Sequence, residues 1–305
     1  MRSNVSVDSS VVNVVTYEVV HLTQYEYSEA VSVSHYIARL NPRTLAYQRC
    51  LHHELQIDPQ PDTTTTHVDY FGNSMTFFAM HVAHRRLTVR ARSQIALHPI
   101  SVPKPSATPP WEQALDHRAL PLDAVEYGFD SAGLRPSGEL ATYARSSFPA
   151  GRPMLMAVMG LTGRIHDEFT FDPGATTVAT SLAQVFQSRR GVCQDFARLE
   201  IACLRALGLP ARYVSGYLET LPPPGRPRLL GTDASHAWLA VYCPGIGWID
   251  VDPTNNVLPS GTHITLAWGR DYEDVGPVRG IILGGGEHSL QVSVDVMRIE
   301  NMVDG

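Results

Sequence analysis

Alternating apolar and polar residues dominate the first hundred positions of the chain. In residues 87–97 the odd positions are apolar or small and the even positions mostly polar, which is typical of a strand with one buried face. Other short runs rich in Val, Tyr, Thr and Phe are separated by Asn-Pro, Asp-Pro and Gly-Asn turn signals. This pattern predicts an N-terminal antiparallel β-sandwich domain over residues 12–100.

The pattern changes after this region. Residues 102–110 are rich in proline, which can neither continue a helix nor sit inside a sheet, so we expect a linker or connector over residues 101–135. Helical segments follow, with candidates at residues 137–148, 153–169 and 181–187. The second domain is therefore predicted to be a mixed α and β core over residues 136–305, including C-terminal strands.

One helix in this core carries the most information. It is expected over residues 192–207, because Gly208 and Pro210 supply a C-terminal stop. Its apolar residues recur at spacings of three and four and predict a buried face, namely Phe196, Leu199, Cys203 and Leu207. Two strands, at residues 235–242 and 248–252, follow it and are joined by a Pro-Gly turn.

Composition narrows the class of protein. Of 305 residues, 44% are hydrophobic and 18% charged, as in a packed globular protein. The formal net charge of -6 and the lack of long basic runs argue against nucleic acid as a partner. No apolar stretch is long enough for a membrane helix, and residues 1–10 lack the plan of a signal peptide. We therefore expect a cytoplasmic protein, and the four scattered cysteines fit reduced thiols.

Cys193 is the cysteine with the most reactive predicted position. It follows Gly191-Val192 at the start of the helix, where unpaired backbone N–H groups and the helix dipole favour a thiolate. A thiolate nucleophile also needs a base, and the base needs a group that orients it. His236 fits the role of base. Its partner on the adjacent strand could be Asp250 or Asp252, and the alternation alone does not choose between them.

Three motifs now occur in order, and together they resemble the bacterial transglutaminase-like family: residues 191–197 (GVCQDFA), 236–238 (HAW) and 247–255 (GWIDVDPTN). Residues 17–21, 69–73 and 269–272 resemble further parts of such proteins. The resemblance implies an α+β protein with a papain-like, transglutaminase-like core. It also implies that the acidic residue before Pro-Thr, Asp252, completes the triad, with Asp250 as the runner-up.

The resemblance further implies chemistry on a peptide or protein amide through a thioester, with no required cofactor. We expect hydrolysis by a cysteine peptidase, with transfer to an amine by a protein-glutamine transamidase as the alternative. A further alternative is a peptide-binding module that keeps the fold without the reaction. Animal relatives use calcium, but no calcium-binding loop motif occurs in this sequence.

Several other residues have both a functional and a structural interpretation. Gln194, Asp195 and Trp238 are candidates for substrate or oxyanion contacts, although helix capping is the simpler account for Asp195 and a surface position for Gln194. We expect no metal site, because the pairs His52-His53 and His81-His84 lie in strand-like sequence without a third ligand. The remaining candidates are expected to be mainly structural: Cys50, Cys203, Cys243, Arg212, Tyr213, residues 270–272 and residues 284–286.

Overall fold

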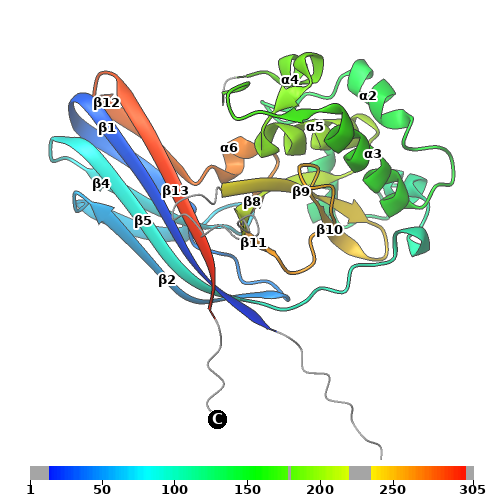
Figure 1. Ribbon diagram of the computed structural model, residues 1–305, viewed down its shortest axis with the longest axis horizontal. Coiled ribbons are helices and arrows are strands. Elements are labelled where there is room, and N and C mark those ends of the chain that lie inside the picture. The colour runs from blue at the N-terminus through cyan, green and yellow to red at the C-terminus, as the bar shows by residue number, and fades with distance from the viewer. Residues whose placement is uncertain (1–13, 178–179, 220–234, 300–305) are drawn as a thin grey trace, which may run out of the picture.

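The computed structural model of the protein describes residues 14–177, 180–219 and 235–299. An antiparallel sheet of seven strands packs beside a helical region that covers a four-stranded sheet (Figure 1). The large sheet is built around one long strand, β1 (Val15–Ala38). Its other members are β2 (Gln48–Asp58), β3 (Thr63–Val68), β4 (Ser74–Met80), β5 (His84–Leu97), β12 (Val278–Gly284) and β13 (His288–Ile299).

The two halves of the long strand β1 pair with different strands. Its first half pairs with β5 and β13, and its second half pairs with β4 and β12, with a register shift between Glu26 and Val31. Val89 and Ala91 of β5 share one hydrophobic cluster with Phe78 of β4, so the two halves enclose a common core. The predicted N-terminal antiparallel β-structure is thereby confirmed.

The C-terminal strands occupy a different place from the one predicted. We assigned them to the second domain, but β12 and β13 both pair with β1 of the N-terminal sheet. In Figure 1 the red β13 runs along the blue β1. Pairing between strands about 260 residues apart leaves no local pattern in a sequence, because the alternation identifies a strand and not its partner.

The predicted linker is a packed segment of short helices. It contains α1 (Leu122–Val125) and three 3₁₀ helices, at Pro105–Ala107, Trp111–Leu115 and Glu126–Gly128. The Trp111 side chain is buried, and its Nε1–H donates to the carbonyl oxygen of Pro149 at 3.1 Å. The prolines are compatible with these short helices at their first positions, and the apolar residues Trp111 and Ala114 between them belong to the core.

The second region has the predicted mixture of helices and strands. Its sheet follows the order β10-β9-β8-β11. The strands are β8 (Ala211–Leu218), β9 (Ser235–Cys243), β10 (Gly247–Val251) and β11 (His263–Gly269), and a small parallel pair joins β6 (Thr170–Phe171) to β7 (Arg190–Gly191). The helices are α2 (Gly138–Arg145), α3 (Met154–Glu168), α4 (Leu182–Ser188), α5 (Cys193–Ala206) and α6 (Tyr272–Val275).

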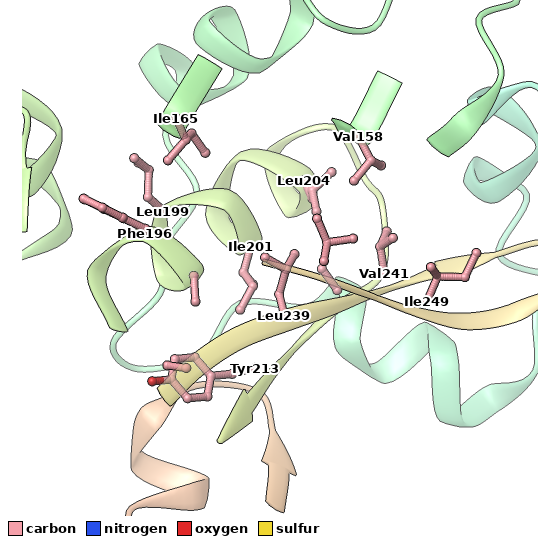
Figure 2. Packing of buried hydrophobic residues seen from close by; sticks show 14 of the residues in the cluster. Val158, Ile165, Phe196, Leu199, Ile201, Leu204, Tyr213, Leu239, Val241 and Ile249 are labelled. Carbon is pink, nitrogen blue, oxygen red and sulfur yellow. The ribbon is translucent and has the colours of Figure 1, made fainter. Parts of the chain in front are cut away.

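Helix α5 is the central helix of this region. It lies between α3 and the four-stranded sheet, with Leu199, Ile201 and Leu204 fully buried (Figure 2). Leu239 and Val241 of β9 pack in the same cluster. Complete burial of each such side chain contributes roughly 1.5–3 kcal/mol. This packing fixes the helix, and with it the position of Cys193 at its first turn.

Candidate active site

The start of α5 is organised around Asp195. The Val192 N–H donates to Asp195 Oδ2 at 2.9 Å, and the Thr176 hydroxyl donates to the same oxygen at 2.6 Å. Asp195 is buried in the first helical turn, where a carboxylate also interacts favourably with the helix dipole. These contacts are those of a capping residue, and they hold Cys193 as the first residue of the helix.

Gly191 lets this carboxylate approach the backbone. A Cβ at position 191 would lie 2.8 Å from Asp195 Oδ2 and 2.9 Å from its Cβ. We therefore expect Gly191→Ala to lower the free energy of unfolding by about 1–3 kcal/mol, measured by denaturant titration. Gly138→Ala is the control, because a Cβ there meets no atom within 4 Å. Equal stability of the two variants would contradict this account of the motif.

The structure brings His236 and Asp252 together. His236 is the second residue of β9, and Asp252 directly follows β10, which pairs with β9 in antiparallel fashion. His236 Nε2 lies 2.8 Å from Asp252 Oδ2, and the imidazole lines the same cavity as Cys193, with which it interacts electrostatically. The three residues singled out by the motifs thus lie at one site, between the start of α5 and the turn after β10.

His236 and Asp252 each favour the ionised form of the other. Burial alone would lower the pKa of His236, but hydrogen bonds and charge interactions with Asp252 and Cys193 raise it to about 10. Burial opposes the ionisation of Asp252 as well, yet hydrogen bonds to the two histidines His236 and His263 hold its pKa well below the usual value. At neutral pH the pair is therefore an imidazolium and a carboxylate.

Asp252 accepts hydrogen bonds from more groups than the sequence indicated. His263 Nε2 on β11 lies 2.9 Å from Oδ2, and Asn255 Nδ2 donates to the same oxygen at 2.7 Å. The N–H groups of Thr254 and Asn255 donate to Oδ1 at 2.9 and 3.2 Å. Asn255 belonged to the third motif. His263 was missed, because only the pairing of β11 with β8 brings it to this place.

His236, Asp252 and His263 also form a cluster of possible metal ligands. Both imidazole Nε2 atoms lie at hydrogen-bond distance from the same Oδ2 atom, so the three groups satisfy one another as hydrogen-bond partners. A metal ion would instead need unprotonated nitrogens directed at one point. Among the described residues, the pairs His52-His53 and His81-His84 form no such cluster.

Asp250, the alternative acidic residue, lies in different surroundings. It lines a separate cavity with Tyr47 and Arg212, and burial raises its pKa, although the charge of Arg212 opposes the shift. Arg212 itself stacks between two indoles, 4.3 Å from the ring centre of Trp248 and 3.7 Å from that of Trp268. This arrangement favours a structural role for Arg212.

Trp238 and Gln194 both lie near the cysteine–histidine pair. The Trp238 ring is fully buried and stacks beside the imidazole of His236, with 6.0 Å between ring centres. It also meets His263 edge-on at 5.0 Å. Gln194 lines the same cavity as Cys193. Trp238 therefore shields one side of His236 from water, while Gln194 remains accessible from the cavity.

The other three cysteines lie in surroundings that oppose ionisation of the thiol. Burial raises the pKa of Cys203 and Cys50, and it raises that of Cys243 to about 11. These three thiols are protonated at neutral pH, which makes them poor nucleophiles.

Residues 270–272, expected to be mainly structural, lie close to the site. Asp271 caps α6 and forms an ion pair with Arg198 of α5 at 2.9 Å. Tyr272 and Tyr213 both line the cavity beside Cys193. Residues 284–286 form no such site: Gly284 ends β12, and the three glycines have positive φ in the turn before β13.

A cavity of about 140 Å³ opens in front of Cys193 and His236. Its lining comes from α5, β8 and β9 on one side and from the N-terminal sheet on the other. The reactive pair therefore lies at the junction of the two regions, and residues of both regions contact anything that reaches the sulfur.

Comparison with known proteins agrees with this architecture. Residues 17–96 match the family described as bacterial transglutaminase-like N-terminal region, and residues 143–253 match the transglutaminase-like superfamily. The crystal structure of "a Putative Cysteine Protease from Cytophaga hutchinsonii" superimposes with a TM-score of 0.75 at 22% identity, covering 95% of this chain and 92% of that one. This likeness establishes the fold.

Two curated relatives extend the comparison to sequence identity. An uncharacterized protein of Mycobacterium tuberculosis is 42% identical over 295 residues, which is 93% of each chain. Protein-glutamine gamma-glutamyltransferase of Pseudomonas aeruginosa is 38% identical over 123 residues, or 38% of this chain and 18% of that protein. The chain belongs to the transglutaminase-like superfamily, with the bacterial N-terminal region of that group. In residues 14–177, 180–219 and 235–299, no helix has the length and apolar character needed to cross a membrane.

Proposed function

We propose that the protein is a cysteine enzyme that cleaves or transfers peptide or protein amide bonds through a thioester on Cys193. The observation that carries this proposal is the arrangement of Cys193, His236 and Asp252 beside an open cavity, with His236 hydrogen-bonded to Asp252 and interacting with Cys193. Nucleophile, base and orienting acid are the three parts that acyl transfer requires.

Each residue has a defined role in the proposed reaction. The Cys193 thiolate attacks the amide carbon, and the positive end of the α5 dipole stabilises the negative charge that develops there. The His236 imidazolium then gives its proton to the departing amine, leaving a thioester and a neutral imidazole. Water or a second amine attacks the thioester, His236 takes up its proton, and the thiolate is released.

Asp252 acts on His236 and not on the substrate. Its Oδ2 accepts the hydrogen bond from Nε2, which leaves Nδ1 as the ring nitrogen available for proton exchange with the thiol. The hydrogen bonds from His263 and Asn255 hold the carboxylate in this orientation. Asp252 thereby fixes the ring and stabilises its positive charge.

The acceptor of the acyl group separates two versions of the function. We rank hydrolysis first, because the solved structure that matches nearly the whole chain carries a cysteine-protease designation. Transfer to an amine is the second version, and the match to the glutamyltransferase over 123 residues favours it. The peptide-binding module without a reaction ranks below both, since His236 is hydrogen-bonded to Asp252 and lines the same cavity as Cys193.

A partition experiment distinguishes the first two versions. The protein is incubated with a peptide library, the acyl-enzyme is trapped and located by mass spectrometry, and increasing amounts of an amine probe such as a dansylated cadaverine are added. We expect the acyl group on Cys193 and release mainly to water. Products that shift to the amine adduct in proportion to its concentration would establish the transamidase instead. No acyl-enzyme with any peptide would contradict both versions.

A further inference from the structure

The cavity beside Cys193 has a second side that the family motifs do not include. Two strands of the N-terminal sheet, β1 and β13, face the reactive pair there. Their contribution is a patch defined by Thr23, Tyr25, Leu290 and Val292, which we name the β1–β13 wall.

The wall continues a face of the sheet that elsewhere is buried. Opposite residues of β1 and β13 are paired in register, namely Val19 with Val296, His21 with Val294, Thr23 with Val292 and Tyr25 with Leu290. Directly opposite residues of an antiparallel pair share a face. Val294 and Val296 pack fully buried against the second region, whereas Leu290 and Val292, on the same face, are 52% and 48% exposed. The apolar stripe therefore extends past the domain contact and over the cavity.

Among the residues that the structure describes, no Asp, Glu, Lys or Arg side chain lines the cavity. His21 bonds to Thr23 Oγ1 at 2.9 Å and to the Tyr217 hydroxyl at 3.0 Å, and burial lowers the pKa of His21 to about 4, so this imidazole is neutral at pH 7. The β1–β13 wall itself consists of a hydroxyl, a phenol and two apolar side chains. A charged side chain bound against this wall would lose water without gaining a charged partner there.

We propose that the β1–β13 wall selects the substrate: it binds an uncharged, apolar side chain next to the amide carbonyl that Cys193 attacks. The inference rests on the proposed function, because it names the substrate class of the same site. Leu290 and Val292 are its specificity-determining residues. Their exposed surface is continuous with the cavity, and an apolar substrate side chain would cover it.

The first experiment needs no amide chemistry. Iodoacetamide and N-benzyliodoacetamide carry the same reactive carbon, but only the second has an apolar tail. We expect Cys193 to react about tenfold faster with the benzyl reagent than with iodoacetamide, as is typical for occupation of an apolar pocket. Leu290→Asp should reduce this preference to about one. An unchanged preference in Leu290→Asp would overturn the proposal.

Leu51→Asp is the matched control. Leu51 lies on β2 of the same sheet, is 51% exposed against 52% for Leu290, and does not line the cavity at Cys193. Because both leucines are half exposed, both variants are expected to fold, which circular dichroism and thermal unfolding check. The control should keep the tenfold preference of the unsubstituted protein. Equal loss in both variants would also overturn the proposal.

The second experiment uses peptides that differ only in the residue beside the attacked carbonyl, with Leu, Asn or Asp at that place. We expect kcat/KM to be highest for Leu, and Leu290→Lys to raise the value for Asp relative to Leu by about tenfold. If all three peptides form an acyl-enzyme and their order of kcat/KM is the same in Leu290→Lys, substrate selection by the β1–β13 wall is wrong, while the proposed function stands. If the benzyl preference depends on Leu290 but no peptide forms an acyl-enzyme, the wall binds apolar groups and the proposed function is wrong.

Discussion

Replacing Cys193 by alanine is expected to abolish acyl-enzyme formation and lower kcat/KM by at least about 10⁴-fold, since no other group in the cavity is placed to form the thioester. The stability of the fold should change by less than about 1 kcal/mol, because Cys193 is only partly buried at the first turn of α5. Intact-protein mass spectrometry after incubation with substrate, together with steady-state kinetics, measures both effects.

Cys50→Ala is the control for this prediction. Like Cys193 it is a free cysteine of intermediate burial, but it lies on β2 and outside the cavity. Limiting iodoacetamide should label Cys193 before Cys50, Cys203 and Cys243. Equal labelling of all four thiols, or full activity in Cys193→Ala, would contradict the assignment of the nucleophile.

Asp252→Asn is the second change with a large expected effect. It removes the carboxylate that orients His236 and stabilises its positive charge, so we expect kcat to fall by about 10⁴-fold, as for comparable catalytic triads. The fold should also lose about 1–3 kcal/mol, because His236 and His263 lose a charged hydrogen-bond acceptor. Steady-state kinetics and thermal unfolding measure the two losses separately.

The pH dependence of activity tests the same role of Asp252. Contacts with Asp252 and Cys193 raise the pKa of His236 to about 10, so the unsubstituted enzyme should keep its imidazolium until the pH approaches 10. The loss of activity at alkaline pH should move to lower pH in Asp252→Asn. Since the folded-state pKa of His236 lies above the ordinary 6.5, these contacts stabilise the fold fully below about pH 6.5. That contribution is lost as the pH rises through about 10.

Asp250→Asn tests which of the two aspartates, Asp250 or Asp252, orients His236. The alternating pattern alone did not choose between them. Asp250 lines the cavity with Arg212 and Tyr47, so its replacement should affect stability more than the pH profile. A shifted alkaline limit in Asp250→Asn, with an unchanged one in Asp252→Asn, would reverse the assignment.

The sequence predicted those parts of the structure that follow from local patterns. The apolar spacing of Phe196, Leu199 and Cys203 gave the buried face of α5, because a helical period is determined within a few turns. The motif around Cys193 predicted the start of the helix, which is also a local feature of the sequence. The position of His236 relative to Asp252 also followed, since a tight turn joins their strands.

Contacts between distant segments could not be predicted in this way. His263 reaches Asp252 only through the pairing of β11 with β8. The spacing of residues along the sequence does not indicate which strands pair in a sheet. The place of β13 beside β1 was missed for the same reason. Both cases depend on which strands pair, a choice determined by the packing of the whole chain.

The pairing of β1 with β13 brings the beginning and the end of the described chain to the same side of the cavity. A shortened protein that keeps only the region from α2 to α6 would retain Cys193, His236 and Asp252 but lose every residue of one cavity side. It would also expose the apolar surface that Val294 and Val296 now cover. The core motifs alone therefore do not define the smallest part of the protein in which substrate selection can be measured.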